Sequence, residues 1–367
     1  MSPKSRRRIH PSALCCRAMN SPKLKANCPN PACPDPAQNA KFAVTKHSLL
    51  KTKSGLRRRY SCAACRSTFA ATTGTVYERM RKSKSDFDKA THMQSEGMTK
   101  AAIARVLKVS PSTITRWLAK AGNHAAAFHK ENARLPEAVE VQLDELSCKG
   151  TGEAKNAWAY SGVEVWSRFW ATLKVGRRTL GNTYIFARQL RAVLIGESKD
   201  FLVTSDCFKY YEPVMRVVFG KTPLVYVQVK NHYFRKGIRK SDKTLVLGTP
   251  DQLEDAMARS EDSKKPNTAY IERLNLHKRM SCSMLRRRTP APGRSCARIQ
   301  EALELVRVFY NFVTPHGSLK FGKVKRTPAM QAGIFDRPLT IREIFSWVPP
   351  AKPKWGEKAV ATMASEY

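Results

Sequence analysis

The stretch that decides the fold is NTAYIERLNLHKRMSCSMLRRRT, residues 267–289. Pro266 and Asn267 form a helix-entry signal, and the pattern after them predicts a helix to about residue 285. One face of this helix is expected to be apolar and the opposite face polar. The apolar residues are Ala269, Leu274, Leu276, Met280 and Met284, and the polar ones are Glu272, Asn275, Arg279 and Arg286. Glu272 is the single carboxylate of this basic segment, and it is either a surface residue paired with an arginine or part of a site.

The composition predicts extended contact with a polyanion. The chain has 367 residues, with 66 Lys plus Arg against 29 Asp plus Glu, and a net charge of +37. Such a charge destabilises a compact fold through self-repulsion unless a polyanion relieves it. The basic residues are spread along the chain, and neither a basic amphipathic anchor nor an apolar run of about 18 residues occurs. We therefore expect two or three domains, a nucleic-acid partner, no membrane and no small-molecule substrate.

The N-terminal residues 1–24 are predicted to be a disordered basic arm. They begin MSPKSRRRIHPSALCC, which lacks the apolar core of a signal peptide. The ten cysteines do not form the pattern of a secreted disulfide framework, because four of them have metal-ligand spacing. A reducing cytoplasm, with the protein associated with the nucleoid, is the expected location.

Residues 25–80 are predicted to be a zinc ribbon. Cys28 and Cys33 are separated by four residues, and Cys62 and Cys65 by two, so each pair can hold one side of a tetrahedral Zn²⁺. Residues 51–60 between the pairs predict a hairpin with a glycine at its turn. Four buried free cysteines are the alternative, but a short segment with few large apolar residues can hardly fold without such a staple. With four cysteine ligands, the zinc would be structural.

Residues 81–122 predict a helix-turn-helix that binds DNA. Residues 87–94 form the first helix, Thr99 can cap the second, and Ser110 followed by Pro111 can start the third. The residues expected in the core are Ile103, Val106, Leu107, Ile114, Trp117 and Leu118. The residues expected to face DNA are Ser112, Thr113, Thr115, Arg116 and Lys120, because short hydroxyls and basic groups suit major-groove contacts. An ordinary helical hairpin with a solvated polar face is the alternative.

Residues 123–137 are interpreted as a linker or connecting helix, and residues 138–320 as an α/β catalytic domain. Strands are expected at residues 139–143, 157–165, 167–175, 201–204 and 224–229, and helices at 181–195, 208–219 and 298–313. Three antiparallel-type strands followed by helix, strand, helix and strand is the order of a ribonuclease H-like fold. The prediction is a mixed five-stranded sheet flanked by helices.

Three carboxylates are expected to converge at one edge of this sheet. Asp144 ends the first strand, Asp206 ends the fourth, and Glu272 lies on the late helix. Asp144 is preferred to Glu145 because it continues the strand alternation, and Asp206 has the alternative role of a helix N-cap. Phosphodiester chemistry can use two divalent ions about 4 Å apart, and oxygen ligands suit Mg²⁺ or Mn²⁺. Arg279, or the arginines at 286–288, would hold phosphate oxygens.

Residues 230–266 form a basic insertion in this pattern. Its basic residues are Lys230, His232, Arg235, Lys236, Arg239, Lys240 and Lys243, interleaved with Tyr233 and Phe234. We interpret the insertion as a DNA-contact surface beside the site, with a solvated basic loop as the alternative. It also predicts a short edge strand at residues 245–248 and a helix at 250–260. Residues 321–367 are predicted to be a basic C-terminal tail with a short helix at 341–347.

Taken together, these motifs resemble the DDE-type bacterial insertion-sequence transposases, specifically the insertion-sequence-one-like group. The motifs that carry the resemblance are the four cysteines with STFAATTGTVY, LDEL at 143–146, SD at 205–206, VLGTPDQLEDAMARS at 246–260, NTAYIERLNLHKR at 267–279, LRRRT at 285–289 and NFVTPHGSL at 311–319. The resemblance implies Mg²⁺-dependent cleavage at the terminal repeats of an element and transfer of the 3′-hydroxyl into target DNA. It implies Asp144, Asp206 and Glu272 as the catalytic triad, Arg279 as a helper, and a homo-oligomer bridging two DNA ends. Two features depart from the pattern: His277-Lys278 before the arginine, and the long basic tail.

Two other functions compete with the transposase. A DNA-binding regulator would keep the ribbon and the helix-turn-helix without cutting DNA. A structure-selective nuclease or resolvase would cut branched DNA without making a joined product.

Overall fold

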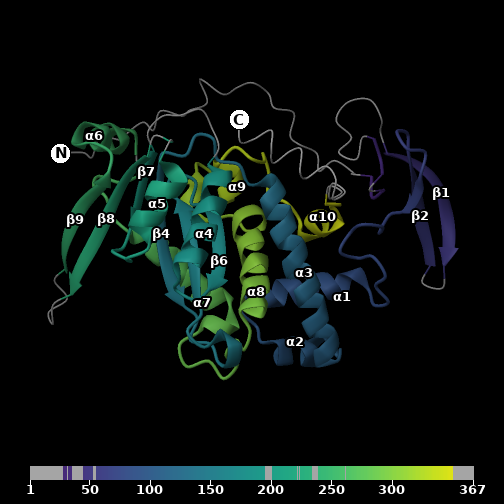
Figure 1. Ribbon diagram of the computed structural model, residues 1–367. Coiled ribbons are helices and arrows are strands. Elements are labelled where there is room, and N and C mark those ends of the chain that lie inside the picture. The colour runs from purple at the N-terminus through teal and green to yellow at the C-terminus, as the bar shows by residue number, and fades with distance from the viewer. Residues whose placement is uncertain are drawn as a thin grey trace.

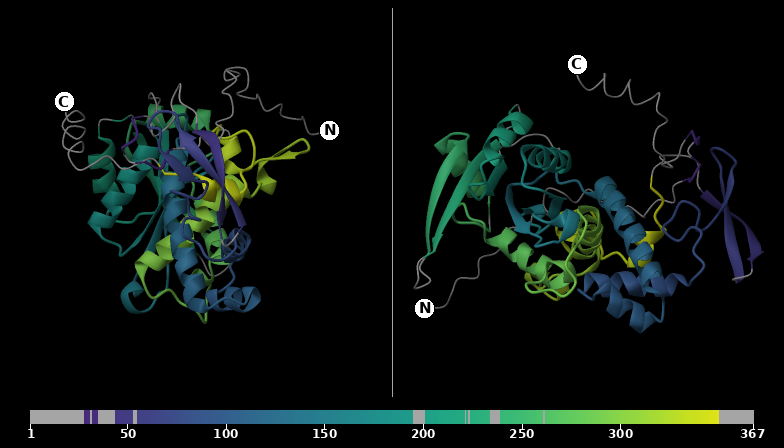
Figure 2. Two further views of the ribbon diagram at one scale, coloured as in Figure 1. Left: turned by 90° about the vertical axis from the view of Figure 1, so that its right-hand side faces the viewer. Right: turned by 60° about the horizontal axis from the view of Figure 1, so that its bottom comes forward.

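The computed structural model describes residues 28–30, 32–34, 44–52, 55–194, 201–220, 222, 224–233, 239–260 and 262–349. The predicted arm at residues 1–24, the turn of the first hairpin, Arg235, Lys236 and the end of the predicted tail lie outside this part of the chain. The described elements form an elongated molecule. The hairpin of β1 and β2 lies at one end, the hairpin of β8 and β9 lies at the other, and the helices α1–α3 lie between the first hairpin and the large sheet (Figures 1 and 2).

The N-terminal strands form a small antiparallel sheet of order β1-β2-β3. The strands are β1 (Val44–Thr52), β2 (Gly55–Cys62) and β3 (Thr68–Ala70). The predicted hairpin is present, and the register pairs Thr52 with Gly55 at the turn.

Three helices follow. The starts of the second and third agree with the predicted caps, whereas the first begins three residues before its predicted start. They are α1 (Lys84–Ser95), α2 (Lys100–Leu107) and α3 (Pro111–Asn132). The side chains of Thr99 and Ser110 accept hydrogen bonds from backbone N–H groups in the first turns of α2 and α3. Most of the predicted core residues of these helices are buried, but Val106 is 56 % exposed, so its predicted core position is wrong.

Helix α3 continues without interruption through most of the predicted linker at residues 123–137. It packs on α8 (Cys296–Val308), and Gly122 lies where the two helices are closest. A Cβ atom at Gly122 would stand 2.3 Å from the backbone oxygen of Glu301. The helix-turn-helix is therefore joined to the large α/β unit by a packed helix.

The large sheet is mixed and six-stranded, in the order β6-β5-β4-β7-β8-β9. Its strands are β4 (Glu140–Ser147), β5 (Trp158–Glu164), β6 (Trp170–Gly176), β7 (Phe201–Ser205), β8 (Leu224–Tyr233) and β9 (Arg239–Leu247). Strands β4, β5 and β6 are antiparallel neighbours, whereas β4, β7 and β8 are parallel neighbours. The prediction of a mixed sheet flanked by helices is confirmed, but five strands is wrong. Residues 239–247 of the basic insertion form a sixth strand, which pairs antiparallel with β8.

Helices cover both faces of this sheet. Helices α4 (Leu180–Val193) and α5 (Tyr211–Phe219) pack on one face, and α6 (Pro250–Arg259), α7 (Ala269–Ser281) and α8 on the other. A single wider turn, Phe309–Val313, continues α8, and short helical turns lie at Gly152–Ala154, Ser283–Leu285 and Gly317–Leu319. Alternation along β4 sends Val141 and Leu143 toward α4 and α5, and Gln142 and Asp144 toward α7.

The segment after residue 320 packs into the body of the molecule. It contains β10 (Lys320–Phe321), β11 (Val324–Lys325), α9 (Pro328–Gln331) and α10 (Ile341–Ser346). Phe345 is fully buried, with ring contacts to Tyr77 and Phe87, and Arg342 pairs with Asp88 at 2.5 Å. Residues expected to be a tail thus complete the core around α1 and α3.

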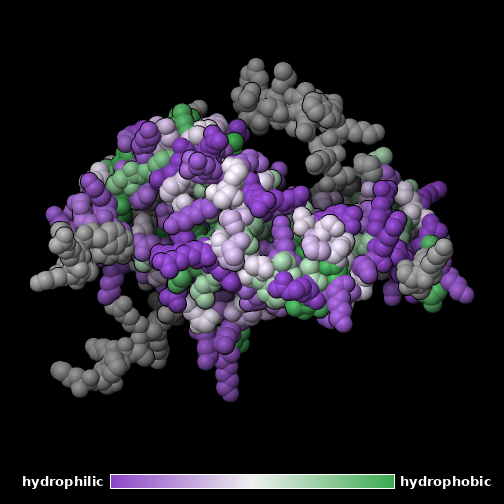
Figure 3. All heavy atoms as spheres, turned by 90° about the horizontal axis from the view of Figure 1, so that it is seen from below, coloured by the Kyte–Doolittle hydropathy of each residue, from purple (hydrophilic) through white to green (hydrophobic). Residues whose placement is uncertain are grey.

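One face of the molecule, seen from below (Figure 3), is polar, as the charge predicts. The face shown in Figure 3 is mostly hydrophilic, with hydrophobic residues in small separate patches.

Candidate functional site

Three acidic side chains meet at one edge of the large sheet, beyond the last residues of β4 and β7 that pair with each other. Strand β4 continues to Ser147, so the predicted end of this strand at Asp144 is wrong. Asp144 and Glu145 lie on β4, and Asp206 follows β7 directly. One carboxylate oxygen from each lies within 4.8 Å of the others. Because β4 and β7 are parallel neighbours, their carboxyl ends lie at the same edge of the sheet. The predicted meeting of Asp144 and Asp206 is therefore present.

Burial and mutual repulsion shape the chemistry of this acidic cluster, which consists of Asp144, Glu145 and Asp206. Burial and the Asp206 carboxylate raise the pKa of Asp144 to about 6, and the same two causes raise the pKa of Glu145 to about 7. Burial also raises the pKa of Asp206. A divalent cation among these oxygens would favour their ionised forms, and an all-oxygen donor set suits a hard cation such as Mg²⁺.

Two polar groups on α7 support Asp144. Asn275 donates a hydrogen bond from Nδ2 to Oδ2 of Asp144 at 2.5 Å. Its own Oδ1 is buried, and no hydrogen-bond donor of the described residues reaches it. Lys278 is fully buried, and its Nζ donates to Oγ of Ser161, the residue paired with Asp144 in the sheet, at 2.8 Å. Burial lowers the pKa of Lys278 to about 8.

Two buried residues fix the start of α7 against the strands that carry the aspartates. Gln142, two residues before Asp144, accepts hydrogen bonds from the backbone N–H groups of Tyr270 and Ile271 at 2.9 and 3.2 Å. Thr204, two residues before Asp206, donates to the backbone oxygen of Asn267 at 2.9 Å. Sequence reasoning missed both residues. Their signal was present, because a polar side chain inside a buried strand needs a partner on the face to which it points.

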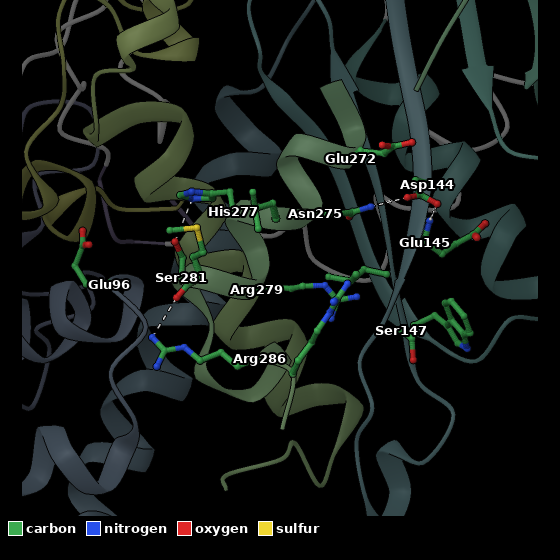
Figure 4. Close-up of a pocket in the computed structure, with 15 residues that line it drawn as sticks. Glu96, Asp144, Glu145, Ser147, Glu272, Asn275, His277, Arg279, Ser281 and Arg286 are labelled. Atoms are coloured by element: carbon green, nitrogen blue, oxygen red, sulfur yellow. Dashed lines mark hydrogen bonds between the residues drawn. The ribbon is translucent and has the colours of Figure 1, made fainter. Parts of the chain in front are cut away.

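Glu272 lies on α7 beside the acidic cluster. It is half-buried, it accepts a hydrogen bond from Thr268 Oγ1 at 3.1 Å, and its side chain points toward β4 near Asp144 (Figure 4). Among the described residues, however, the group whose oxygens all lie within 4.8 Å contains Glu145 rather than Glu272. Glu145 was set aside on strand alternation, yet its carboxylate lies at the same sheet edge. It also forms an ion pair with Arg178 at 2.8 Å.

A cleft of about 1160 Å³ extends from these carboxylates along α7 to the end of α1. Asp144, Glu145 and Glu272 line one part of it, and Glu96, directly after α1, lines another. The basic residues that line it are Arg279, Arg286 and Arg287. In Figure 4, Arg279 extends from α7 toward the strand that carries Asp144. The cleft thus combines acidic residues with arginines, whose guanidinium groups are able to bind phosphate.

The outward face of α7 differs from the prediction. Leu276 and Met280 were expected in the core, but they line the cleft and are 58 % and 63 % exposed. Ala269 is also exposed, whereas Leu274 and Met284 are buried as predicted. The residues that anchor α7 are Ile271, Leu274 and Lys278, so the buried stripe is rotated from the expected one.

The predicted DNA-contact residues lie at two places. On α3, Ser112 and Arg116 are exposed and Thr113 and Thr115 are partly exposed, whereas Lys120 donates to the backbone oxygen of Glu78 at 2.9 Å. On the long hairpin, Lys230 of β8 and Lys240 of β9 are exposed, and Arg239 begins β9.

The four cysteines of residues 28–65 form a second candidate metal centre. The Sγ atoms of Cys28 and Cys65 are 3.6 Å apart, those of Cys33 and Cys62 are 3.7 Å apart, and all four lie within 4.8 Å of one another. Four ligands at the usual zinc–sulfur distance of about 2.3 Å stand about 3.8 Å apart at the corners of a tetrahedron. The thiols are therefore spaced to surround one tetrahedral ion.

Comparison with known proteins identifies no family. No protein-family model matches this chain, and no curated protein matches it. In the part of the chain that the structure describes, no helix is both long and apolar enough to cross a membrane. The function is therefore inferred from the acidic cluster, the four cysteines and the cleft.

Proposed function

We propose that this chain is a Mg²⁺-dependent DNA transposase, which cuts the ends of an insertion element and joins the 3′-hydroxyl ends to target DNA. One observation carries the proposal. Asp144, Glu145 and Asp206 converge at a sheet edge, and the first two line a cleft together with Glu272. Arg279, Arg286 and Arg287 line the same cleft. Carboxylates that hold divalent cations, next to arginines that bind phosphate, are what phosphodiester chemistry requires.

The order of the strands supports a ribonuclease H-like assignment. Strands β6, β5 and β4 are antiparallel neighbours, and β7 and β8 continue the sheet in parallel with β4. The carboxylates come from β4, from the residue after β7 and from α7, which are the elements expected from the sequence. Strand β9 then extends the sheet by one strand.

The residues divide the work at the acidic site. Asp144 and Asp206 would hold the cations together with Glu272 or Glu145. Bound Mg²⁺ supplies activation of the attacking oxygen and stabilisation of the leaving oxygen. Asn275 holds Asp144 in place through its 2.5 Å hydrogen bond. Arg279 and Arg287 would bind the non-bridging oxygens of the phosphate, since a guanidinium can donate two parallel hydrogen bonds.

The remaining elements would deliver DNA to this site. The cysteine cluster would hold a structural Zn²⁺ that stabilises the β1–β3 sheet, and the helices α1–α3 would place Arg116 and its neighbours in a major groove. Joining two element ends requires two active sites held together, so a homo-oligomer on DNA is part of the proposal.

Two variants test whether Glu272 or Glu145 is the third metal ligand. We expect Glu272→Gln to retain DNA binding and to slow strand cutting by about a hundredfold or more, because a lost carboxylate ligand weakens the metal site. We expect Glu145→Gln to cut within about tenfold of wild type, because Glu145 already pairs with Arg178. The assay uses duplexes from the DNA that flanks the coding sequence, with Mg²⁺. The opposite ranking of the two variants would assign the ligand to Glu145.

The same assay separates the competing functions. A joined product with target DNA supports the transposase. Cutting of branched duplexes without joining would instead favour a structure-selective nuclease. Tight binding of the duplexes by the wild-type chain without any cutting would leave a DNA-binding regulator.

A further inference from the structure

The apolar side chains of Leu276 and Met280 lie in a cleft that is otherwise charged. They are 58 % and 63 % exposed, and they line the cleft together with Glu272 and Arg279. On a helix, residues 272, 276 and 279–280 fall on one stripe, so both apolar groups share the face that carries the carboxylate. Phosphates and divalent cations offer no favourable contact to such side chains.

The charged surroundings limit what can cover these two side chains. Arg279, Arg286 and Arg287 line the same cleft, and the protein carries a large positive charge. A polyanion is therefore the occupant that this charge favours. The apolar part of a nucleic acid is the face of a base, which is exposed once the base leaves the stack.

The spacing along α7 places the apolar groups close to the reacting phosphate. At 1.5 Å per helical residue, Leu276 and Met280 lie about 6 and 12 Å along the axis from Glu272. Nucleotides of one strand rise about 3.4 Å each, so the two side chains reach bases roughly two to four nucleotides from the cut.

We propose that Leu276 and Met280 form an apolar wedge against which a base about two to four nucleotides from the cut phosphodiester packs after leaving the duplex stack. The wedge rests on the proposed function, since Glu272 defines where the cut phosphate lies. Apolar side chains inserted at base steps unstack DNA in this way, and an unbranched methionine adapts to the shape of a base.

The wedge is tested by fluorescence of 2-aminopurine, which rises when the base unstacks. Duplexes of the DNA flanking the coding sequence carry one 2-aminopurine at successive positions, and Ca²⁺ replaces Mg²⁺ so that binding is measured without cutting. We expect wild-type protein to raise the signal about threefold or more at one or two adjacent positions. The double variant Leu276→Ser/Met280→Ser is expected to bind these duplexes but to lose most of the rise.

A matched control replaces two exposed apolar residues outside the cleft by serine. Leu180 on α4 and Val217 on α5 are 51 % and 72 % exposed and lie outside the cleft, so Leu180→Ser/Val217→Ser is expected to keep the full signal. In Mg²⁺, the wedge variant is expected to cut paired duplex about tenfold more slowly. A mismatch at the position where the fluorescence rises is expected to restore the rate, because the mismatch lowers the cost of unstacking.

The possible outcomes distinguish the wedge from the proposed function. A bound wild-type protein that raises the signal at no position overturns the wedge while strand cutting still stands. An unstacked base without any cutting in Mg²⁺ supports the wedge and overturns the transposase. If the wedge variant keeps the signal and alters only the sedimentation of the protein, the two side chains form a contact between copies of the chain, and the wedge is again overturned.

Discussion

At the scale of single residues, Asp144 shows why the acidic cluster destabilises the folded chain when no cation is bound. Burial and the neighbouring Asp206 both raise its pKa, from 3.8 to about 6. Its ionised form is therefore less favourable in the folded chain than in the unfolded chain. Below about pH 4 both states are protonated and no penalty exists. The penalty grows as the pH rises toward 6 and is complete above that pH, so without a bound cation the cluster destabilises the fold at neutral and alkaline pH.

We predict that Asp144→Asn stabilises the protein at pH 8 in the absence of added Mg²⁺, raising its Tm by roughly 3–6 °C. The gain should shrink toward pH 4, where the wild-type carboxyl is protonated. Thermal unfolding at several pH values measures the effect, with Asp255→Asn on the exposed face of α6 as the control. Added Mg²⁺ should stabilise wild type and leave Asp144→Asn nearly unchanged. Equal Tm values for wild type and Asp144→Asn at pH 8 would contradict the buried repulsion described here.

Single residues also show how far sequence reasoning reached at the site. Asp206 was found because it follows a recognisable strand, and Asp144 because it lies on one, although β4 continues past it to Ser147. Glu145 was set aside because Asp144 continues the strand alternation, but alternation does not show that an oxygen of Glu145 lies within 4.8 Å of the other two carboxylates. Leu276 and Met280 were predicted to lie in the core because the prediction used only the spacing of apolar residues along α7. The buried Lys278 pairs with Ser161, and it rotates the helix relative to that pattern.

At the scale of elements, the contact between α3 and α8 depends on one glycine. A Cβ atom at Gly122 would meet the backbone of Glu301 at 2.3 Å, and backbone cannot move aside as a flexible side chain can. We predict that Gly122→Ala destabilises the protein by about 1–3 kcal/mol, even though alanine favours helix more than glycine does. Gly181 of α4 is the matched control, because a Cβ atom there would meet nothing within 4 Å. Gly181→Ala should be neutral or stabilise by up to about 1 kcal/mol.

Denaturant unfolding of the two alanine variants tests this contact. A Gly122→Ala protein as stable as the Gly181→Ala protein would show that α3 and α8 can separate without cost. The comparison also bears on the predicted linker, because a flexible connection at residues 123–137 would tolerate both substitutions equally.

The stability of the small β1–β3 sheet depends on four thiols. They belong to Cys28, Cys33, Cys62 and Cys65. This sheet buries few large apolar side chains, so a bound metal would supply most of its stability. We predict that chelation, or Cys62→Ser, unfolds residues 28–70 and weakens binding to element-end duplexes. Metal content of the purified protein and limited proteolysis measure the first effect, and mobility shift measures the second. Cys207→Ser, at an exposed position after β7, is the control and should alter neither. Unchanged binding after metal removal would show that the sheet does not take part in recognition.

At the scale of the whole molecule, the net charge of +37 is distributed over the full length of the molecule. The helices α1–α3 and the β8–β9 hairpin lie on opposite sides of the strands β4, β5 and β6 (Figure 1). Each phosphate contact contributes about 0.9 to the slope of the logarithm of affinity against the logarithm of salt concentration. We predict that Lys230→Gln/Lys240→Gln lowers this slope by about 2 while leaving the pattern of cut sites unchanged.

The control for the hairpin lysines removes equal charge elsewhere. Lys130 at the end of α3 and Lys325 of β11 are exposed, and Lys130→Gln/Lys325→Gln should change the slope by less. Equal slopes for the two double variants would mean that the hairpin binds DNA no more closely than the rest of the surface does.

The order of helices and strands was largely predictable, because helix caps and strand alternation depend on residues that are close together in the sequence. The boundaries between units were not, because they depend on packing between distant segments. Residues 321–349 are rich in proline and basic residues, yet Phe345 and Trp347 contact α3 through ring contacts with His124 and Phe128.

This long-range closure has a consequence for biosynthesis. The hydrophobic centre around α1 and α3 stays incomplete until Phe345 has left the ribosome, although those helices are translated early. In a nascent polypeptide, the core of the helices α1–α3 would therefore stay incomplete throughout elongation. Premature termination before α10 would leave these helices without the ring contacts that Phe345 makes.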